Sequence, residues 1–344
     1  MAKPNDPFLA ACRREQTTYT PIWLMRQAGR YMEEYRKLRR QYGFLELCKK
    51  PDLAAEITVT AVERLGVDAA ILFADILLIV EPMGVGLEYS KGDGPVVHHP
   101  VRSGKDVDGL TDFDPEKELS FVYDAVRKIS KALKDKVPLI GFAGAPFTLA
   151  SYLIEGGGSR NYVHTKKFFY TAPESWKRLL ERLAKLTAEY LRCQITAGAE
   201  VVQLFDSWAG CLTPSDYEHF VMPYTRTVID SLPPTVPVIH FSTGTAGSLK
   251  QIRAAGGSVI GLDWRVNLEE AWQTVGYDVA VQGNLDPVSL FAPPKEIRNR
   301  VADILRRAGA RPGHIFNLGH GVLPETPVEN VIALVEAVHE LSAR

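Results

Sequence analysis

Short, continuously apolar runs recur along the chain, and amphipathic segments separate most of them. Continuous runs are typical of parallel strands covered on both faces, whereas strands with one face in water alternate apolar and polar residues. We count eight: PIWLM (21–25), AAILFA (69–74), PLIGFA (138–143), VVQLF (201–205), PVIHF (237–241), SVIGL (258–262), VAVQG (279–283) and HIFNLG (314–319).

The segments between the runs carry the signals of helix starts. Thr213, followed by Pro214, predicts one N-cap. Thr326, followed by Pro327 and by Glu329 three positions on, predicts another with a capping box. The segment 174–192 predicts a helix, because its apolar residues form one stripe at helical spacing: Trp176, Leu179, Leu180, Leu183, Leu186 and Tyr190.

Eight strands alternating with helices predict a single (β/α)8 barrel of the TIM type, forming one domain over residues 1–344. A doubly wound sheet is the alternative. The segment 86–101 departs from the alternation, because two short β-like runs flank Lys91-Gly92-Asp93-Gly94, which predicts a small hairpin excursion. We expect the polar stretch 102–118 to be a loop of that excursion.

The composition is that of a folded protein. Hydrophobic residues make up 46% of the 344 positions and charged residues 24%, and the net charge of -1 gives no general basic field for nucleic acid. The four cysteines are far apart, which suggests reduced thiols. The N-terminus has no apolar signal segment, and Asp75 interrupts the longest apolar run, so we expect no membrane span and a cytoplasmic location. A processed organelle precursor is the alternative.

Polar residues follow every apolar run, at the point where the strand is expected to end. Because the active sites of such barrels lie at the carboxyl ends of the strands, this pattern predicts an enzyme. In chain order the residues are Arg26 and Arg30, Asp75, Tyr152, Asp206 and Ser207, His240 and Ser242, Asp263 and Arg265, Asn284 and Asp286, and His320.

Four of these residues have surroundings that favour chemistry. Arg26 and Arg30 flank the small residues Ala28 and Gly29, and arginine binds carboxylates with two parallel hydrogen bonds; a solvated helix face is the alternative. Asp75 lies in an apolar run, where a carboxylate needs donors or a ligand, with a helix cap as the alternative. His320 lies between two glycines, which favours function over a purely structural role.

Several other chemistries lack their residues. Strand ends carry no lysine for a Schiff base. Gly92-Asp93-Gly94 lacks the paired asparagines of a thiamine-diphosphate signature, and Gly156-Gly157-Gly158 lacks the spaced pattern of a phosphate loop, so we expect a flexible loop there. Neither HExxH nor CxxC occurs. We therefore expect no metal and no organic cofactor.

Five blocks resemble the uroporphyrinogen decarboxylase family: WLMRQAGRYM (23–32), AILFADIL (70–77), GAPFTLASYLIEGGGS (144–159), QLFDSWAG (203–210) and NLGHGV (317–322). The similarity runs in order over about residues 7–341. It implies a single (β/α)8 barrel that forms homodimers and works without a cofactor. It also implies the conversion of the four acetate arms of uroporphyrinogen to methyl groups, giving coproporphyrinogen and carbon dioxide in tetrapyrrole synthesis.

The resemblance also implies roles for individual residues. Asp75 would accept hydrogen bonds from the pyrrole N–H groups at the centre of the macrocycle, and Arg26 is the family's candidate proton donor. Arg39 matches a flanking position, and the role of His240 is open. The implied catalytic residues are Asp75, Arg26 and Tyr152, and the implied substrate-binding residues are Arg26, Gln27, Arg30, Tyr35, Asp75, Tyr152, Ser207 and His320.

Two rival functions share these features. Related barrels are methyltransferases that serve a corrinoid protein and hold zinc through a His-x-Cys pair and a later Cys. Here the corresponding segment is His240-Phe241-Ser242, and the last strand end carries His320, so the thiolates are missing. A carrier that binds a tetrapyrrole without turnover would use the same arginines and differs only in lacking activity.

Overall fold

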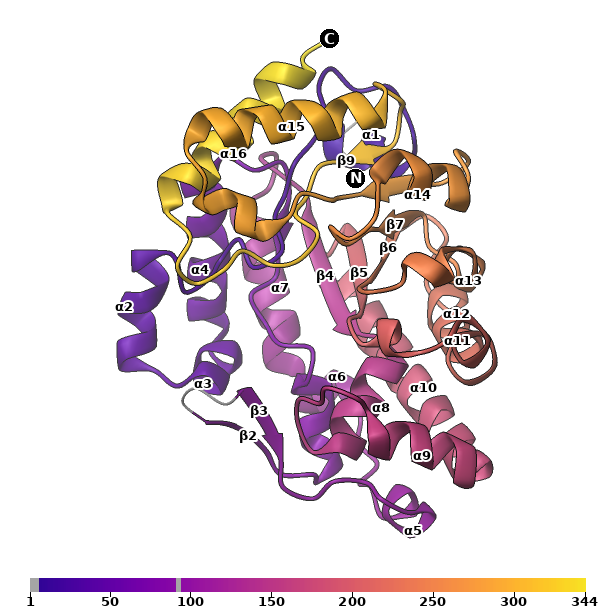
Figure 1. Cartoon of the computed structure of the whole chain (residues 1–344). Coiled ribbons are helices and arrows are strands. Elements are labelled where there is room, and N and C mark those ends of the chain that lie inside the picture. The colour runs from indigo at the N-terminus through magenta and orange to yellow at the C-terminus, as the bar shows by residue number, and fades with distance from the viewer. Residues whose placement is uncertain (1–5, 91–93) are drawn as a thin grey trace.

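The computed structural model describes residues 6–90 and 94–344, which form a curled sheet of seven parallel strands surrounded by helices (Figure 1). Each strand of this sheet pairs with the next along the chain, in the order β1-β4-β5-β6-β7-β8-β9. The strands are β1 (Ala70–Ile71), β4 (Leu139–Gly144), β5 (Val201–Asp206), β6 (Val238–Ser242), β7 (Val259–Gly261), β8 (Ala280–Gln282) and β9 (His314–Ile315).

The first apolar run closes the sheet into a barrel. Ile22 forms a parallel bridge with Phe316, just after β9, and its carbonyl accepts a hydrogen bond from the amide of Asp68, just before β1 (2.8 Å). The run therefore lies between the last and the first strand, although only Ile22 bridges. This arrangement confirms the predicted TIM-type barrel and excludes the doubly wound sheet, because a doubly wound sheet has two open edges.

Helices cover the outside of the barrel and follow nearly every strand. The long helix α10 contains the predicted segment 174–192, and its stripe is buried except for Leu186, which is partly exposed. The α-helices are α1 (Pro7–Cys12), α2 (Glu33–Gln41), α3 (Phe44–Lys49), α4 (Pro51–Leu65), α5 (Gly104–Asp108), α6 (Pro115–Glu118), α7 (Ser120–Ala132), α8 (Pro146–Glu155), α9 (Val163–Thr171), α10 (Pro173–Ala197), α11 (Pro214–Phe220), α12 (Met222–Asp230), α13 (Leu249–Ala255), α14 (Leu268–Val275), α15 (Pro294–Ala308) and α16 (Val328–Ser342).

The described residues also form four short 3-10 helices, each of which follows a strand: η1 (Leu78–Met83), η2 (Ala209–Cys211), η3 (Ala246–Ser248) and η4 (Pro287–Phe291). Asp286 begins η4, because its Oδ1 accepts a hydrogen bond from the amide of Val288 (2.9 Å). These turns shape the loops at the carboxyl end of the barrel.

The two predicted helix caps have different outcomes. Thr213 caps α11, and its Oγ1 accepts a hydrogen bond from the amide of Asp216 (3.1 Å), as predicted. The prediction of a capping box at Thr326 is wrong. Pro327 has an extended backbone (φ -63°, ψ 130°), so α16 begins one residue later, and the buried Oγ1 of Thr326 has no hydrogen-bond partner among the described residues.

The hairpin excursion is confirmed as an antiparallel pair, β2 (Leu87–Ser90) and β3 (Gly94–Val97). The expected turn at 91–93 lies outside the described residues. The hairpin is tied to α8, because the amide of Val97 donates to the carbonyl of Gly156 (2.9 Å). The expectation of one loop over 102–118 is wrong, since Ser103 and Asp114 begin the short helices α5 and α6.

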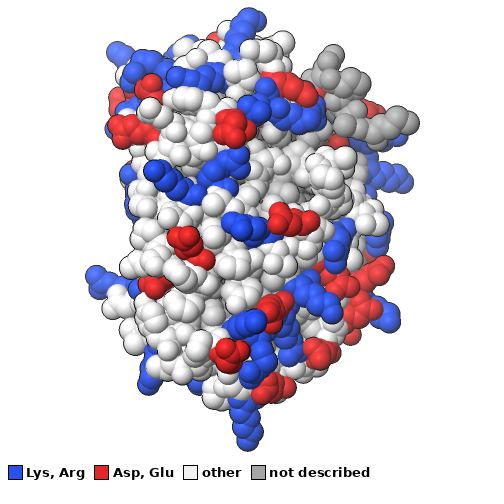
Figure 2. Space-filling view, turned by 90° about the vertical axis from the view of Figure 1, so that its right-hand side faces the viewer, with Lys and Arg blue, Asp and Glu red and all other residues white. Residues whose placement is uncertain are grey.

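Figure 1 shows the hairpin at one end of the molecule and helices α15 and α16 at the other. On the flank drawn in Figure 2, lysine and arginine side chains are mixed with aspartate and glutamate. Among the described residues, no helix combines the length and the apolar character that crossing a membrane requires.

Candidate active site

The loops after the first run and after the last strand meet at the carboxyl end of the barrel. The amide of Val322 donates to the carbonyl of Met25 (2.9 Å). Arg26 has a φ of 61°, in the left-handed region, and its side chain passes directly over Gly321. A Cβ at position 321 would lie 2.4 Å from Cδ of Arg26, so this approach requires glycine. The two ends of the chain thereby bring Arg26 beside His320.

Asp75 lies just past β1, where the chain turns into η1. Its Oδ1 accepts two hydrogen bonds, from the amide of Leu77 (2.8 Å) and from the hydroxyl of Tyr89 on strand β2. Among the described residues, no donor is bonded to its Oδ2. The two donors therefore fix one oxygen of the carboxylate.

Opposing effects act on the charge of Asp75. Burial raises the pKa of its carboxyl group, while the hydroxyl of Tyr89, the amide of Leu77 and the positive charge of Arg26 lower it; burial has the largest effect. The net direction is upward. Ionising this carboxylate therefore costs more than in water, and a positive charge beside it would lower that cost.

Tyr152 projects from α8, and Trp208, which follows Ser207 after β5, packs edge-on against it with ring centroids 5.7 Å apart. Burial, and next the charge of Asp75, raise the pKa of Tyr152 to about 12. The phenol therefore stays protonated near neutral pH and can donate a hydrogen bond. The carbonyl of Ser207 accepts from the hydroxyl of Thr243 (2.6 Å), which joins the ends of β5 and β6.

His320 is partly buried, and its Nδ1 accepts a hydrogen bond from the amide of Gly321 (2.8 Å). Burial, and then the charges of Arg26 and Arg265, lower its pKa to about 4. The imidazole is therefore neutral near pH 7. With Nδ1 accepting, Nε2 carries the proton and can donate to a carboxylate.

Among the described residues, three arginines lie at the mouth of the barrel, which is its opening at the carboxyl ends of the strands: Arg26, Arg30 and Arg265. Arg26 is exposed at the mouth, and its partial desolvation there, followed by the charge of Arg30, lowers its pKa. Arg30 is exposed, and its loop is braced by Arg36, whose guanidinium donates to the carbonyl of Arg30 (3.0 Å). The sequence resemblance did not include Arg265, which lies over the ring of Trp264 with Cζ 3.8 Å from the centroid. The positive charge of these groups makes the mouth suited to a ligand with several carboxylates.

Two residues that the resemblance assigns to the substrate make contacts within the fold. Gln27 is 1% exposed, and its amide group bonds the amide of Leu24 (3.1 Å) and the carbonyl of Ala69 (3.1 Å). Tyr35 is 7% exposed and packs against Phe73, with ring centroids 5.5 Å apart. These contacts hold the loop and α2, and the assignment of both residues to substrate binding stays a prediction.

Other strand-end residues also serve the fold. Oδ1 of Asp206 accepts from Oγ1 of Thr148 (3.2 Å) on α8, and both Asp206 and His240 are fully buried, with Nε2 of His240 4.0 Å from Oδ2 of Asp206. Asn284 donates to the carbonyl of Asp263 (2.8 Å). Part of the crowding of polar residues at the strand ends thus comes from the anchoring of loops.

Tyr89 was not among the residues predicted for the site, although its hydroxyl contacts Asp75. It lies 14 positions from Asp75 in the chain, in a segment predicted only as a hairpin. The one available signal was an aromatic residue in a strand that follows closely on the Asp75 turn. Within the described residues, no cluster of three or more His, Cys, Asp and Glu side chains could hold a metal.

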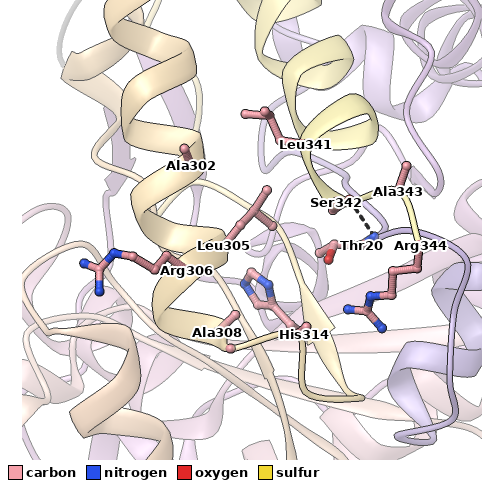
Figure 3. A pocket seen from close by; sticks show the side chains of 12 residues that line it. Thr20, Ala302, Leu305, Arg306, Ala308, His314, Leu341, Ser342, Ala343 and Arg344 are labelled. Carbon is pink, nitrogen blue, oxygen red and sulfur yellow. Dashed lines mark hydrogen bonds between the residues drawn. The ribbon is translucent and has the colours of Figure 1, made fainter.

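A cavity of about 470 Å³ lies at the opposite end of the barrel, between α15, α16 and the start of β9 (Figure 3). His314 lines it, is 3% exposed, and donates from Nε2 to the carbonyl of Gly283 (2.9 Å). Beside it, Oγ of Ser342 accepts a hydrogen bond from the amide of Thr20 (2.8 Å). None of the predicted site residues lies there, so the candidate active site is the arginine-rich mouth.

Comparison with known proteins shows similarity to one family over nearly the whole chain. A family model described as uroporphyrinogen decarboxylase (URO-D) matches residues 3–341. A uroporphyrinogen decarboxylase of Carboxydothermus hydrogenoformans is 58% identical over 340 residues, which cover 98% of this chain and 97% of the relative. Another, of Solibacter usitatus, is 54% identical over 341 residues, which cover 99% of both chains.

Solved structures share the fold at lower identity. A methyltransferase from Methanosarcina mazei superimposes with a TM-score of 0.82 and 20% identity, covering 98% of both chains. At this identity the likeness concerns the architecture alone.

Proposed function

The chain belongs to the uroporphyrinogen decarboxylase family, and on that premise we propose that it converts the four acetate arms of uroporphyrinogen to methyl groups, giving coproporphyrinogen and carbon dioxide. The observation that carries this proposal is the state of Asp75. The protein holds its Oδ1, no described donor occupies its Oδ2, and Arg26 lies near it. A ring of pyrrole N–H groups would supply the missing donors.

Binding follows from the charges of the mouth. Arg26 and Arg30 hold carboxylate arms with paired hydrogen bonds. Neutral His320 and protonated Tyr152 each donate one hydrogen bond without adding charge. Ser207, placed by the bond between its carbonyl and Thr243, contributes a hydroxyl at the end of β5.

The reaction needs a temporary sink for electrons. Protonation of the ring carbon next to the one that carries an acetate arm makes the ring a cation. The bond to the carboxylate carbon then breaks, carbon dioxide leaves, and the electron pair forms an exocyclic C=C double bond that neutralises the ring. A proton added at the exocyclic methylene carbon completes the methyl group, and loss of the proton first added to the ring restores the aromatic pyrrole. Asp75 stabilises the ring cation because it is a fixed negative charge beside the nitrogens.

The first proton needs a donor. Arg26 lies near Asp75, and partial desolvation and Arg30 lower its pKa, which is the direction that a donor requires. The ordinary pKa of a guanidinium is very high, however. A carboxyl group of the substrate or a bound water is the alternative donor, and both would be placed by the same arginines.

Two rival functions fit less well. A methyltransferase site would need thiolate ligands for zinc, and His240 is fully buried beside Asp206 instead of open to a metal. A non-catalytic carrier would not need a carboxylate whose charge burial makes costly. Turnover separates the carrier from the enzyme.

The remaining proposals concern the protein as a whole. We propose that residues 1–344 are one barrel domain, that two copies form a homodimer, and that the enzyme works in the cytoplasm without a metal or organic cofactor. Support comes from the family model over residues 3–341. We also propose a small-molecule substrate and no nucleic-acid or membrane partner, because the net charge of -1 gives no general basic field.

Incubation of the pure protein with uroporphyrinogen, under reducing and anaerobic conditions, tests the proposal. Products are separated by the number of carboxyl groups they retain, and one carbon dioxide is expected for each acetate arm lost. Binding of the substrate without any loss of carboxyl groups would identify a carrier and overturn the enzymatic function.

A further inference from the structure

The hydroxyl of Tyr89 is the only side-chain donor that reaches Asp75 among the described residues. It bonds the same oxygen, Oδ1, that accepts the amide of Leu77. Two donors on one oxygen fix both the position and the rotation of the carboxylate. The second oxygen is thereby turned to where a ligand can donate to it.

Tyr89 is itself held by three elements. Its ring packs against Phe44, the first residue of α3, with ring centroids 4.9 Å apart. Tyr89 pairs with Pro95 across the hairpin, and the amide of Val97 on β3 donates to Gly156 at the end of α8. The hairpin therefore spans the distance between the turn that carries Asp75 and the helix that carries Tyr152.

We propose that Tyr89 is a positioning residue of the decarboxylase: its hydroxyl orients Asp75 toward the pyrrole N–H groups and keeps this carboxylate ionised. A phenol that donates to Oδ1 favours the charged form of the carboxylate, which opposes the effect of burial. The excursion of residues 86–101, which interrupts the barrel pattern, then has a catalytic purpose. This inference rests on the proposed function.

The test is Tyr89→Phe, which keeps the ring that packs against Phe44 and removes the hydroxyl. Without this donor the pKa of Asp75 rises further, so activity is lost at a higher pH. We expect the acidic limb of kcat/KM to move up by about one to two pH units, the size of one hydrogen bond to a charged group. We also expect kcat at the optimum to fall about tenfold, because the carboxylate rotates more freely.

Tyr19→Phe is the matched control. The hydroxyl of Tyr19 donates to Oδ1 of Asp68 (2.7 Å), so the substitution removes the same kind of bond at the other end of the β1 run. It should change thermal stability without moving the pH profile. If Tyr89→Phe and Tyr19→Phe give the same pH profile as the native enzyme, Tyr89 is only a structural residue and the proposal fails.

A second measurement separates this proposal from the proposed function. The titration of the Asp75 carboxyl carbon can be followed by 13C NMR in the ligand-free protein, with Asp75→Asn to assign the signal. An upward shift of the titration in Tyr89→Phe supports the positioning role even if the protein does not turn over uroporphyrinogen. An unchanged titration overturns it even if the native enzyme is active.

Discussion

Replacing Asp75 with asparagine tests the mechanism most directly. The amide oxygen of Asn can accept from the same two donors, the amide of Leu77 and the hydroxyl of Tyr89, so the turn into η1 should survive. What is lost is the charge, and the free oxygen is replaced by an NH2 group that cannot accept from a pyrrole N–H. The substitution therefore separates the electrostatic role from the structural one.

The expected fall in kcat depends on the step of the reaction at which the negative charge of Asp75 acts. Before protonation the ring is neutral, and Asp75 accepts only ordinary hydrogen bonds; after protonation it faces a cation in a partly buried site. Interactions that strengthen in the transition state appear in kcat. Loss of one preorganised electrostatic contact costs about 3 to 4 kcal/mol, so kcat should fall at least about a hundredfold. KM should rise less, because the arginines still hold the arms.

Asp286→Asn is the control for the cap. Asp286 also follows a strand, and its Oδ1 accepts from the amide two residues on, as Asp75 does with Leu77. The assay measures the rate of carboxyl loss at saturating uroporphyrinogen, with thermal melting to check folding. If Asp75→Asn folds and keeps a near-normal kcat, as Asp286→Asn should, Asp75 is only a helix cap and the assignment is refuted.

Four further outcomes are expected. Arg30→Ala should raise KM more than it lowers kcat, because an arm away from the reacting ring is held alike in the ground state and the transition state. Arg40 is exposed, and Arg40→Ala should change neither constant. Steady-state kinetics in which Arg30→Ala lowers kcat more than it raises KM would contradict this. Chelator treatment should leave activity unchanged, and a loss that one metal restores would count against a cofactor-free reaction. Light scattering at micromolar concentration should give a dimer mass, and a monomer mass would disprove the homodimer. Burial lowers the pKa of His314 from 6.5 to about 4, so its contribution to stability is present above pH 6.5 and is lost, up to about 3 kcal/mol, as pH falls toward 4. In urea unfolding, His314→Gln should lose less stability over this pH range than the native protein. An equal dependence of the two unfolding free energies on pH would contradict this role of His314.

Much of the fold could be predicted because parallel strands covered on both faces leave a local mark. The seven later apolar runs each contain a strand. The place of the first run in the barrel could not be read from local pattern, because Ile22 pairs with Phe316, almost three hundred positions away. Thr326 failed as a cap for a local reason, because the backbone of Pro327 is extended there.

The site could be predicted in part, because its charged residues lie at strand ends and in blocks that resemble a family. Gln27 and Tyr35 are assigned to the substrate because they share a block with Arg26. Both are buried, and a block does not tell which of its side chains face a ligand, so their contact with the substrate stays a prediction. Tyr89 was missed for the converse reason. Its hydroxyl meets Asp75 only after the hairpin folds back onto α3, which is a tertiary contact without a local signature.

The electrostatics of Asp75 connect the fold to the reaction. Burial makes its charge costly in the free enzyme, and the hydroxyl of Tyr89, the amide of Leu77 and Arg26 offset only part of that cost. A ring cation beside the same carboxylate would remove the remainder, and its attraction is stronger in the partly buried mouth than in water. The burial that raises the pKa of Asp75 is thus also what makes its charge effective when the pyrrole becomes positive. A more exposed carboxylate would be easier to ionise and would stabilise the cation less, so the partial burial of this turn beneath the hairpin is a compromise between the two.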